Sequence, residues 1–434
     1  MRVVLRGLVL PAVAVMATLG SAQAAWVASH IGTLGGDYTR PSAVNGQGQV
    51  VGISQVGQPG SGGPSHGFVY DRGSIFDVGA AMHGAGVSSA AFGLTNDGRA
   101  VVYGYERQSF ANVAAVYDLN ARTGTIVDFS HLGVSAGLNL NNRGMAVGVA
   151  YSPLVPDAPD RAFTVANGRA VALPLSGSEV HLKGLNDAGQ IFGRYAPGGD
   201  LSRSQSFVID SDGSFTDIGT LGGRLTYIEG FNNSGYAVGR ATLAGGETFR
   251  AFVHVPSGAG LVDLGTLPGG HSSRAVGIND SFQVAGSADV LRPNGQSARH
   301  AVIWSGGLMH DLGSLDGSDY SEALQINNLG QVLGESRDSD GARAMFVWAD
   351  ERMLDLDDLV RDIGITNVLS AVLGDNGFIA GQGTRADGSY AAFLLTPAGH
   401  SQPPGTVGEP GSLALLAVAL LPLLTRRAGV CPAR

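Results

Sequence analysis

The chain has 434 residues, 67 of them glycine, and a formal net charge of −9. Charged residues make up 15% of the sequence, against about 25% in an average soluble protein. The negative charge and the lack of a basic run in the repeated part argue against a nucleic-acid surface, because phosphate binding needs clustered lysine and arginine. A single cysteine, Cys431, excludes an intrachain disulfide, so packing and hydrogen bonds must hold the fold together.

The first element, residues 1–24, is predicted to be a secretory signal peptide. A basic start precedes an apolar stretch over residues 8–20, which is short for a membrane span, and a small-x-small motif follows. Signal peptidase cleaves after such a motif, so we expect export; an uncleaved anchor is the alternative. The residues concerned are Arg2 and Arg6 in the basic start and Ala22 and Ala24 in the cleavage motif.

Residues 25–398 repeat one sequence unit eight times at steps of about 47 residues. Each copy has an apolar residue, an asparagine, two turn residues, usually a glycine, and a further glycine in the strand that follows. A period of this length carried by β-type residues indicates a stacked or radial repeat. The asparagine positions are Asn45, Asn141, Asn186, Asn232, Asn279 and Asn327, and Thr95 and Gly374 hold this position in two degenerate copies.

One copy, from Ala275 to Leu315, predicts four short strands joined by Asn, Asp and Gly turns. Four strands in about 47 residues match a propeller blade. The last copy ends at its third strand near Thr396, whereas residues 26–34 resemble a fourth strand that stands alone. We therefore expect an all-β propeller of eight four-stranded blades, closed by the N-terminal strand. A seven-bladed ring and a β-solenoid are the alternatives.

The constant residues of the repeat are expected to serve the scaffold. An asparagine before two turn residues can bond the backbone and cap the bend, which we favour over a ring of ligand sites. The recurrent strand glycine is expected to permit a bulge or the close approach of another backbone.

No residue cluster predicts a cofactor, a zinc site or a catalytic centre, since HExxH, paired Cys/His spacing and GxSxG are all missing. Asp355, Asp357 and Asp358 lie on one strand and the turn after it, without a placeable partner on another blade. A weaker hypothesis is a calcium-stabilised adhesin, because calcium takes several carboxylate oxygens from one loop; a solvated Asp-Gly turn is favoured instead. The calcium candidates are Asp210, Asp212 and Asp217.

The last elements are a Pro/Gly linker over residues 399–408 and a predicted sorting signal over residues 409–434. The apolar run over residues 412–425 would form a helix of about 21 Å, short of the ~30 Å hydrocarbon core. A short apolar tail between a small motif and basic residues suits a removable signal; a stop-transfer anchor is the alternative. Its motif residues are Glu409, Pro410, Gly411, Arg426 and Arg427.

This end resembles the PEP-CTERM sorting domain of Gram-negative bacteria that make exopolysaccharide, with Gly408 in place of the first proline. The resemblance implies transient insertion into the inner membrane and processing by an exosortase-type enzyme, after signal peptidase has acted. The repeats resemble the bacterial HAF extracellular repeat family in DIGTLGG (217–223), DLGTLPGG (263–270), INDSFQVAG (278–286) and HAVIW (300–304). That family implies a secreted or surface repeat protein and no defined reaction.

Two functions stay open. The first is an exported binding or structural scaffold at the cell surface, in the matrix or in the medium, whose loops at 54–65, 151–160, 194–204 and 289–299 contact polysaccharide or a surface protein. The second is an extracytoplasmic polysaccharide hydrolase or lyase with its site at the axial mouth of the propeller. Three or more carboxylates or arginines converging on the axis would favour the enzyme, and an apolar or glycine-lined axis would argue against it.

Overall fold

The computed structural model describes residues 26–400 except residues 85, 107–110, 128–133, 152–159, 167, 178–179, 197–199, 201, 203, 257–259 and 293. The predicted signal peptide and the predicted sorting segment lie outside the described residues. Across the described residues, no helix is long and apolar enough to cross a membrane.

The described chain consists mainly of short antiparallel strands that pair in sequence order, and six of its sheets have four strands each. Three of them are β2 (Gly35–Val44), β3 (Val50–Val56), β4 (Ser65–Asp71) and β5 (Ser74–Asp77); β6 (Ser88–Leu94), β7 (Arg99–Glu106), β8 (Ala111–Asp118) and β9 (Thr123–Ile126); and β10 (Val134–Leu140), β11 (Ala146–Tyr151), β12 (Asp160–Ala166) and β13 (Arg169–Gly177). Two more are β14 (His181–Leu185), β15 (Ile191–Tyr195), β16 (Gln205–Ile209) and β17 (Phe215–Asp217); and β18 (Gly222–Phe231), β19 (Ala237–Leu243), β20 (Phe249–His254) and β21 (Leu261–Asp263).

A larger sheet holds eight strands in two runs, which one parallel residue pair joins between β24 and β26. The runs are β22 (Ser273–Ile278), β23 (Val284–Leu291), β24 (Ser297–Ser305) and β25 (Leu308–Asp311); and β26 (Tyr320–Ile326), β27 (Val332–Arg337), β28 (Arg343–Ala349) and β29 (Arg352–Asp355).

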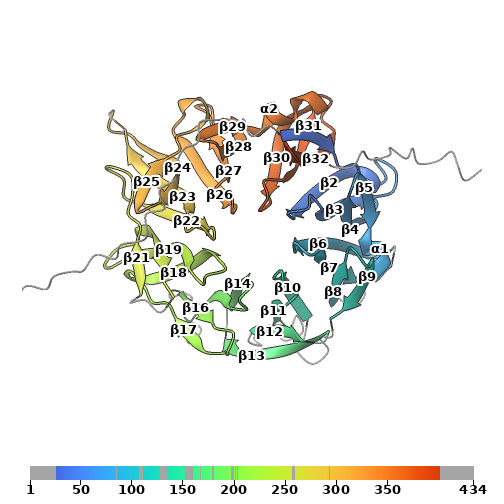
Figure 1. The fold of residues 1–434 in the computed structure, drawn as a ribbon, viewed down its shortest axis with the longest axis horizontal. Helices are drawn as coiled ribbons and strands as arrows, with labels where there is room; N and C mark the ends of the chain where they lie inside the picture. Colours follow the sequence, from blue (N-terminus) through green and yellow to red (C-terminus); the bar gives the residue numbers. More distant parts are fainter. Residues whose placement is uncertain are drawn as a thin grey trace, which may run out of the picture.

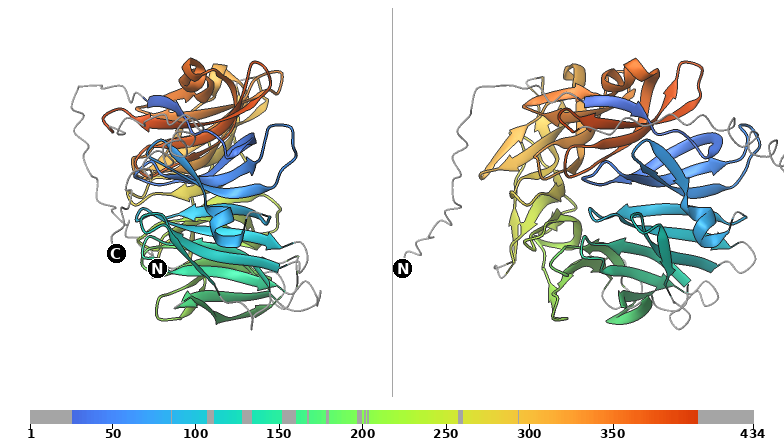
Figure 2. Two further views of the ribbon diagram at one scale, coloured as in Figure 1. Left: turned by 90° about the vertical axis from the view of Figure 1, so that its right-hand side faces the viewer. Right: turned by 45° about the vertical axis from the view of Figure 1, so that its right-hand side comes forward.

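The sixth four-stranded sheet combines the two ends of the described chain. Its order is β1 (Trp26–His30), β32 (Tyr390–Pro397), β31 (Ile379–Arg385) and β30 (Ile365–Leu373). The register runs from Trp26 opposite Pro397 to His30 opposite Phe393. In Figures 1 and 2 the blue β1 accordingly lies beside the red and orange strands of the last repeat.

The sheets are arranged radially around a common centre, with the first strand of each repeat, such as β10, β14, β26 and β30, nearest to it (Figure 1). The prediction of an all-β propeller is therefore confirmed at this level. The arrangement places the turn after each first strand at the centre of the molecule.

The core repeats together with the strands. A buried phenylalanine of the third strand faces the recurrent glycine of the second, as Phe68 faces Gly52 and Phe252 faces Gly239. A Cβ on either glycine would overlap a backbone carbonyl of the first strand, where a register shift marks a bulge. The close backbone approach expected from the sequence is thus what these glycines allow.

The turn after the first strand needs a left-handed residue three positions beyond the repeat asparagine. Glycine holds it in most copies, with φ between 76° and 87° at Gly48 and Gly189, for example. In the sixth copy Phe282 takes this position with φ 61°. The turn geometry is therefore kept even where the residue carries a side chain.

Among the described residues, short helical segments interrupt the strands: α1 (Val78–His83), α2 (Leu356–Val360) and the 3-10 turns η2 (Leu315–Gly317) and η3 (Arg361–Ile363). The sequence analysis placed Asp357 and Asp358 in a simple turn, and this was wrong. The side chain of Asp355 accepts a hydrogen bond from the backbone N–H of Asp357 and caps α2. The carboxylates of Asp357 and Asp358 in the first turn interact favourably with the partial positive charge of the helix N-terminus.

Candidate axial binding site

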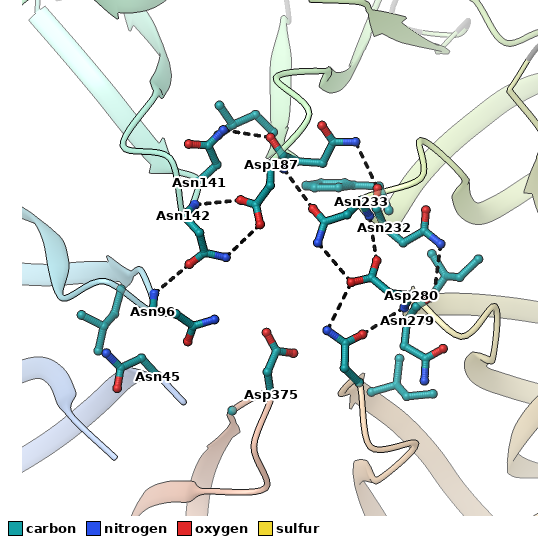
Figure 3. Close-up of a pocket in the computed structure, with 18 of the residues that line it drawn as sticks. Asn45, Asn96, Asn141, Asn142, Asp187, Asn232, Asn233, Asn279, Asp280 and Asp375 are labelled. Atoms are coloured by element: carbon teal, nitrogen blue, oxygen red, sulfur yellow. Dashed lines mark hydrogen bonds between the residues drawn. The ribbon is translucent and has the colours of Figure 1, made fainter. Parts of the chain in front are cut away.

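A cavity of about 320 Å³ lies at the central mouth of the propeller, where the turns after the first strands meet (Figure 3). All eight copies of the repeat contribute to its lining. Three successive positions of each turn matter here: the apolar residue before the repeat asparagine, the asparagine itself and the residue after it.

The position before the asparagine builds an apolar collar within the cavity. Each first strand ends in an aliphatic or aromatic side chain there, and the collar follows from the inward position of that strand. Its members are Val44, Leu94, Leu140, Leu185, Phe231, Ile278, Ile326 and Leu373.

The repeat asparagine is buried and hydrogen-bonded in two directions. In Asn279 the side-chain oxygen accepts from the backbone N–H groups of Ser281 at 3.1 Å and Gln283 at 2.9 Å. Its amide donates to the side chain of Gln283 at 2.8 Å and to the backbone carbonyl of Asn327, in the next repeat, at 3.0 Å. These four bonds use the whole capacity of the amide, so this residue is not free to bind a ligand.

The hydrogen bond from the asparagine amide to a backbone carbonyl of the next repeat recurs around the axis, and we call each such bond a staple. Six of the eight copies make it, at distances of 2.9 to 3.1 Å. Thr95 and Gly374 lack the amide that the bond requires. The donors are Asn45, Asn141, Asn186, Asn232, Asn279 and Asn327.

The residue after the asparagine forms a second, more exposed ring at the mouth. A backbone N–H of one copy donates to the side-chain oxygen of the next copy in six successive steps of 2.7 to 3.0 Å. Figure 3 shows these side chains directed toward one another around the opening. In chain order the ring is Gly46, Asn96, Asn142, Asp187, Asn233, Asp280, Asn328 and Asp375.

The three carboxylates of this mouth ring lie in different environments. Asp187 accepts the amide of Asn142 at 3.1 Å, and Asp280 accepts the amides of Asn233 at 3.1 Å and Asn328 at 3.3 Å. Partial desolvation raises the pKa of Asp375, and the charges of Asp280 and Asp187 add to the rise, while a backbone hydrogen bond from Asn328 opposes it. Asp375 is therefore protonated more readily than an ordinary aspartate.

The carboxylates of the three calcium candidates accept hydrogen bonds from groups of the protein, two of them within their own turns. Asp210 accepts from the Gln190 side chain at 2.7 Å, and Asp212 accepts the backbone N–H of Ser214 at 2.9 Å, which lowers the pKa of Asp212. Asp217 ends β17 and accepts a backbone N–H two residues on at 2.8 Å. Over the described ranges, no three His, Cys, Asp or Glu residues gather in a way that could hold a metal ion.

Two histidines occupy the same position of the repeat, and each contacts the aspartate at the equivalent position of its own repeat. His66 lies 2.7 Å from Asp77, and His300 lies 2.9 Å from Asp311, so each links the start of a third strand to the end of the fourth. A contact between the third and fourth strands therefore explains why histidine occurs at this position in two repeats.

The mouth ring is the feature that sequence reasoning missed. Its column of the repeat holds only asparagine and aspartate apart from one glycine, and this signal was visible in the aligned copies. The column was interpreted as ordinary turn chemistry, for which both residues are common. The loops at 54–65 and 289–299 lie away from the cavity lining, and parts of those at 151–160 and 194–204 lie outside the described residues.

No protein-family model and no curated protein matches the chain. Among solved structures, the β-propeller domain of the Trilobed protease from Pyrococcus furiosus is 9% identical with a TM-score of 0.48, over 73% of this chain and 96% of that one. Porphyromonas gingivalis dipeptidyl peptidase 4 is 11% identical with a TM-score of 0.49, over 80% and 57%. An oligogalacturonate lyase in complex with manganese is 11% identical with a TM-score of 0.44, over 87% and 94%.

Proposed function

We propose that this protein is an exported eight-bladed scaffold, sorted to the cell surface or matrix by its C-terminal segment, whose axial mouth binds polysaccharide. The observation that carries the proposal is the mouth ring of carboxamides and carboxylates above an apolar collar. Planar polar groups of this kind donate to and accept from the hydroxyls of a sugar.

The count of eight blades rests on the eight copies of the turn around one cavity. In this proposal the two runs of the large sheet are separate blades, since a single residue pair joins them. β1 then completes the last blade beside β32 and removes an open edge.

Export and sorting rest on the two sequence signals and on the PEP-CTERM resemblance. The experiment is mass spectrometry of the protein isolated from a producing host. A mature N-terminus after Ala24 and a C-terminus near Glu409 are expected. A protein that retains Arg434 would refute the processing by an exosortase-type enzyme.

Binding is tested with neutral and acidic oligosaccharides by calorimetry on the purified chain. Asp187→Ala removes a carboxylate of the mouth ring and is expected to weaken binding at least tenfold. Asp212→Ala, on an exposed hairpin turn, is the matched control and is expected to leave affinity unchanged. Equal affinities of a folded Asp187→Ala variant and the unaltered protein would contradict the proposed site.

The second candidate, a polysaccharide hydrolase or lyase at the same mouth, is favoured by one observation. Three carboxylates line it, and the one with the raised pKa, Asp375, is suited to donate a proton. Under this alternative, Asp375→Asn abolishes release of reducing ends while saccharide binding persists. Intact saccharide after prolonged incubation with the unaltered protein would leave the binding scaffold as the function.

A further inference from the structure

A cluster of four cations lies on the two innermost strands of three neighbouring repeats, in a chain whose net charge is −9. We call it the basic cluster. Its cations are Lys183 on β14, Arg194 on β15, Arg240 on β19 and Arg274 on β22, and they surround Tyr227 and Glu229 on β18.

One carboxylate, that of Glu229, pairs with two of these four cations. Glu229 lies 3.0 Å from Arg274 and 3.5 Å from Arg240. The side chains of both arginines are about one-third exposed, and Glu229 is more buried than either. Four cations around one acid leave an excess of about three positive charges at a place that solvent and a ligand can reach.

The guanidinium groups are held in position and keep unused hydrogen-bonding capacity. Arg194 and Arg240 lie over the ring of Tyr227, at 5.1 Å and 5.3 Å from its centroid. The Nε atom of Arg240 lies 3.5 Å from the Glu229 carboxylate, and the buried Nε atom of Arg274 has no hydrogen-bond partner among the described residues. The side chains of Arg240 and Arg274 are partly exposed, so an incoming anion can reach them and accept charge-assisted hydrogen bonds.

The pKa of the only lysine of the chain, Lys183, is affected by charges of the same cluster. Burial lowers the pKa of Lys183, the Glu229 carboxylate opposes that change, and the Arg274 charge lowers the pKa further. Repulsion between neighbouring cations is thus already present in the free protein.

We propose that the basic cluster binds carboxylate groups of an acidic, uronate-bearing polysaccharide. Arginine forks and a lysine suit carboxylates, and the stacked tyrosine fixes two of the forks before a ligand arrives. Lys183 and Arg274 stand three and five residues before the repeat asparagines of their strands, about 10 to 17 Å from the axial turns. This inference rests on the proposed saccharide-binding function and assigns the charge of its ligand.

The test compares an oligosaccharide containing glucuronate with the same oligosaccharide after reduction of its carboxyl groups to neutral alcohols. Calorimetry and ligand-induced melting shifts are measured on the whole chain at two salt concentrations. The acidic form is expected to bind at least tenfold more tightly, with an affinity that falls as salt rises. Arg274→Gln should reduce that affinity about tenfold and leave binding of the neutral form unchanged.

Arg299→Gln is the matched control, because Arg299 pairs with Asp289 at 3.0 Å and lies outside the basic cluster. Equal binding of the acidic and neutral forms overturns this inference and keeps the saccharide function. Failure of both forms to bind overturns the saccharide function itself. Polyglutamate that binds as tightly as the acidic saccharide would assign the cluster to protein carboxylates and also overturn the inference.

Discussion

Replacing Asn279 by alanine removes one complete staple of the axial turns and allows its contribution to stability to be measured. The side chain is 3% exposed and makes four hydrogen bonds of 2.8 to 3.1 Å. Each contributes about 1 kcal/mol net, and the alanine leaves buried partners unsatisfied. We expect the free energy of unfolding to fall by about 4 kcal/mol, as measured by urea unfolding monitored by tryptophan fluorescence.

Asn294→Ala is the control within the same repeat, because the side chain of this exposed asparagine bonds Gln296, two residues on, and no other described residue. Its loss should cost less than about 0.5 kcal/mol. The reciprocal change, Thr95→Asn, supplies a missing amide toward the carbonyl of Asn141 and should add about 1 kcal/mol. A loss below about 1 kcal/mol in Asn279→Ala would refute the idea that the staples hold neighbouring repeats together.

Three further changes test other parts of the fold. Asp375→Asn should stabilise the protein at pH 7, because the raised pKa of Asp375 in the folded state means that its ionised carboxylate destabilises the fold. The urea midpoints of the variant and the unaltered protein should converge as the pH falls below about 3.9, where the carboxyl is protonated in both the folded and the unfolded state. A difference in midpoint that does not depend on pH would contradict this prediction. Gly239→Ala would drive a Cβ into a backbone carbonyl of β18 and should cost about 2–3 kcal/mol in urea unfolding, whereas Gly246→Ala, which meets no close atom, should be nearly neutral; similar costs would argue against the packing role. Trp304→Phe removes the indole N–H bond to the carbonyl of Leu264 at 2.9 Å and should lower the thermal midpoint, by a loss of about 1–2 kcal/mol, and an unchanged midpoint would count against that bond.

The sequence analysis predicted the four-stranded repeat because its signals are local. The alternation of apolar residues and the Asn, Asp and Gly turns act within a few residues, as in the hairpin that Asn279 caps. The stray strand at residues 26–34 was also visible, since the last repeat lacks a fourth strand of its own.

The staples and the mouth ring could not be recognised in the same way, because their partners lie one repeat away. The amide of Asn186 bonds a carbonyl 46 residues further on, and Gly46 donates to an oxygen 50 residues further on. Hairpin chemistry accounts for both residues within a single copy, so the second role becomes evident only when the copies surround an axis. The basic cluster is hidden for a related reason, since Lys183 and Arg274 belong to different repeats and share no column.

The contact between the last and the first repeat uses different chemistry from the others. Gly374 has no amide to staple onto the next turn, and Gly46 has no side chain to accept from Asp375. In their place the amide of Asn376 donates to the carbonyl of Gly46 at 2.9 Å. The indole of Trp26, on β1, donates to the carbonyl of Gly377 at 2.8 Å, beside the five-residue pairing of β1 with β32. The Asn376 bond therefore joins the last turn to the first, while the bonds of β1 hold the N-terminal strand within the last sheet, and the proposed eight-bladed ring requires both at its join.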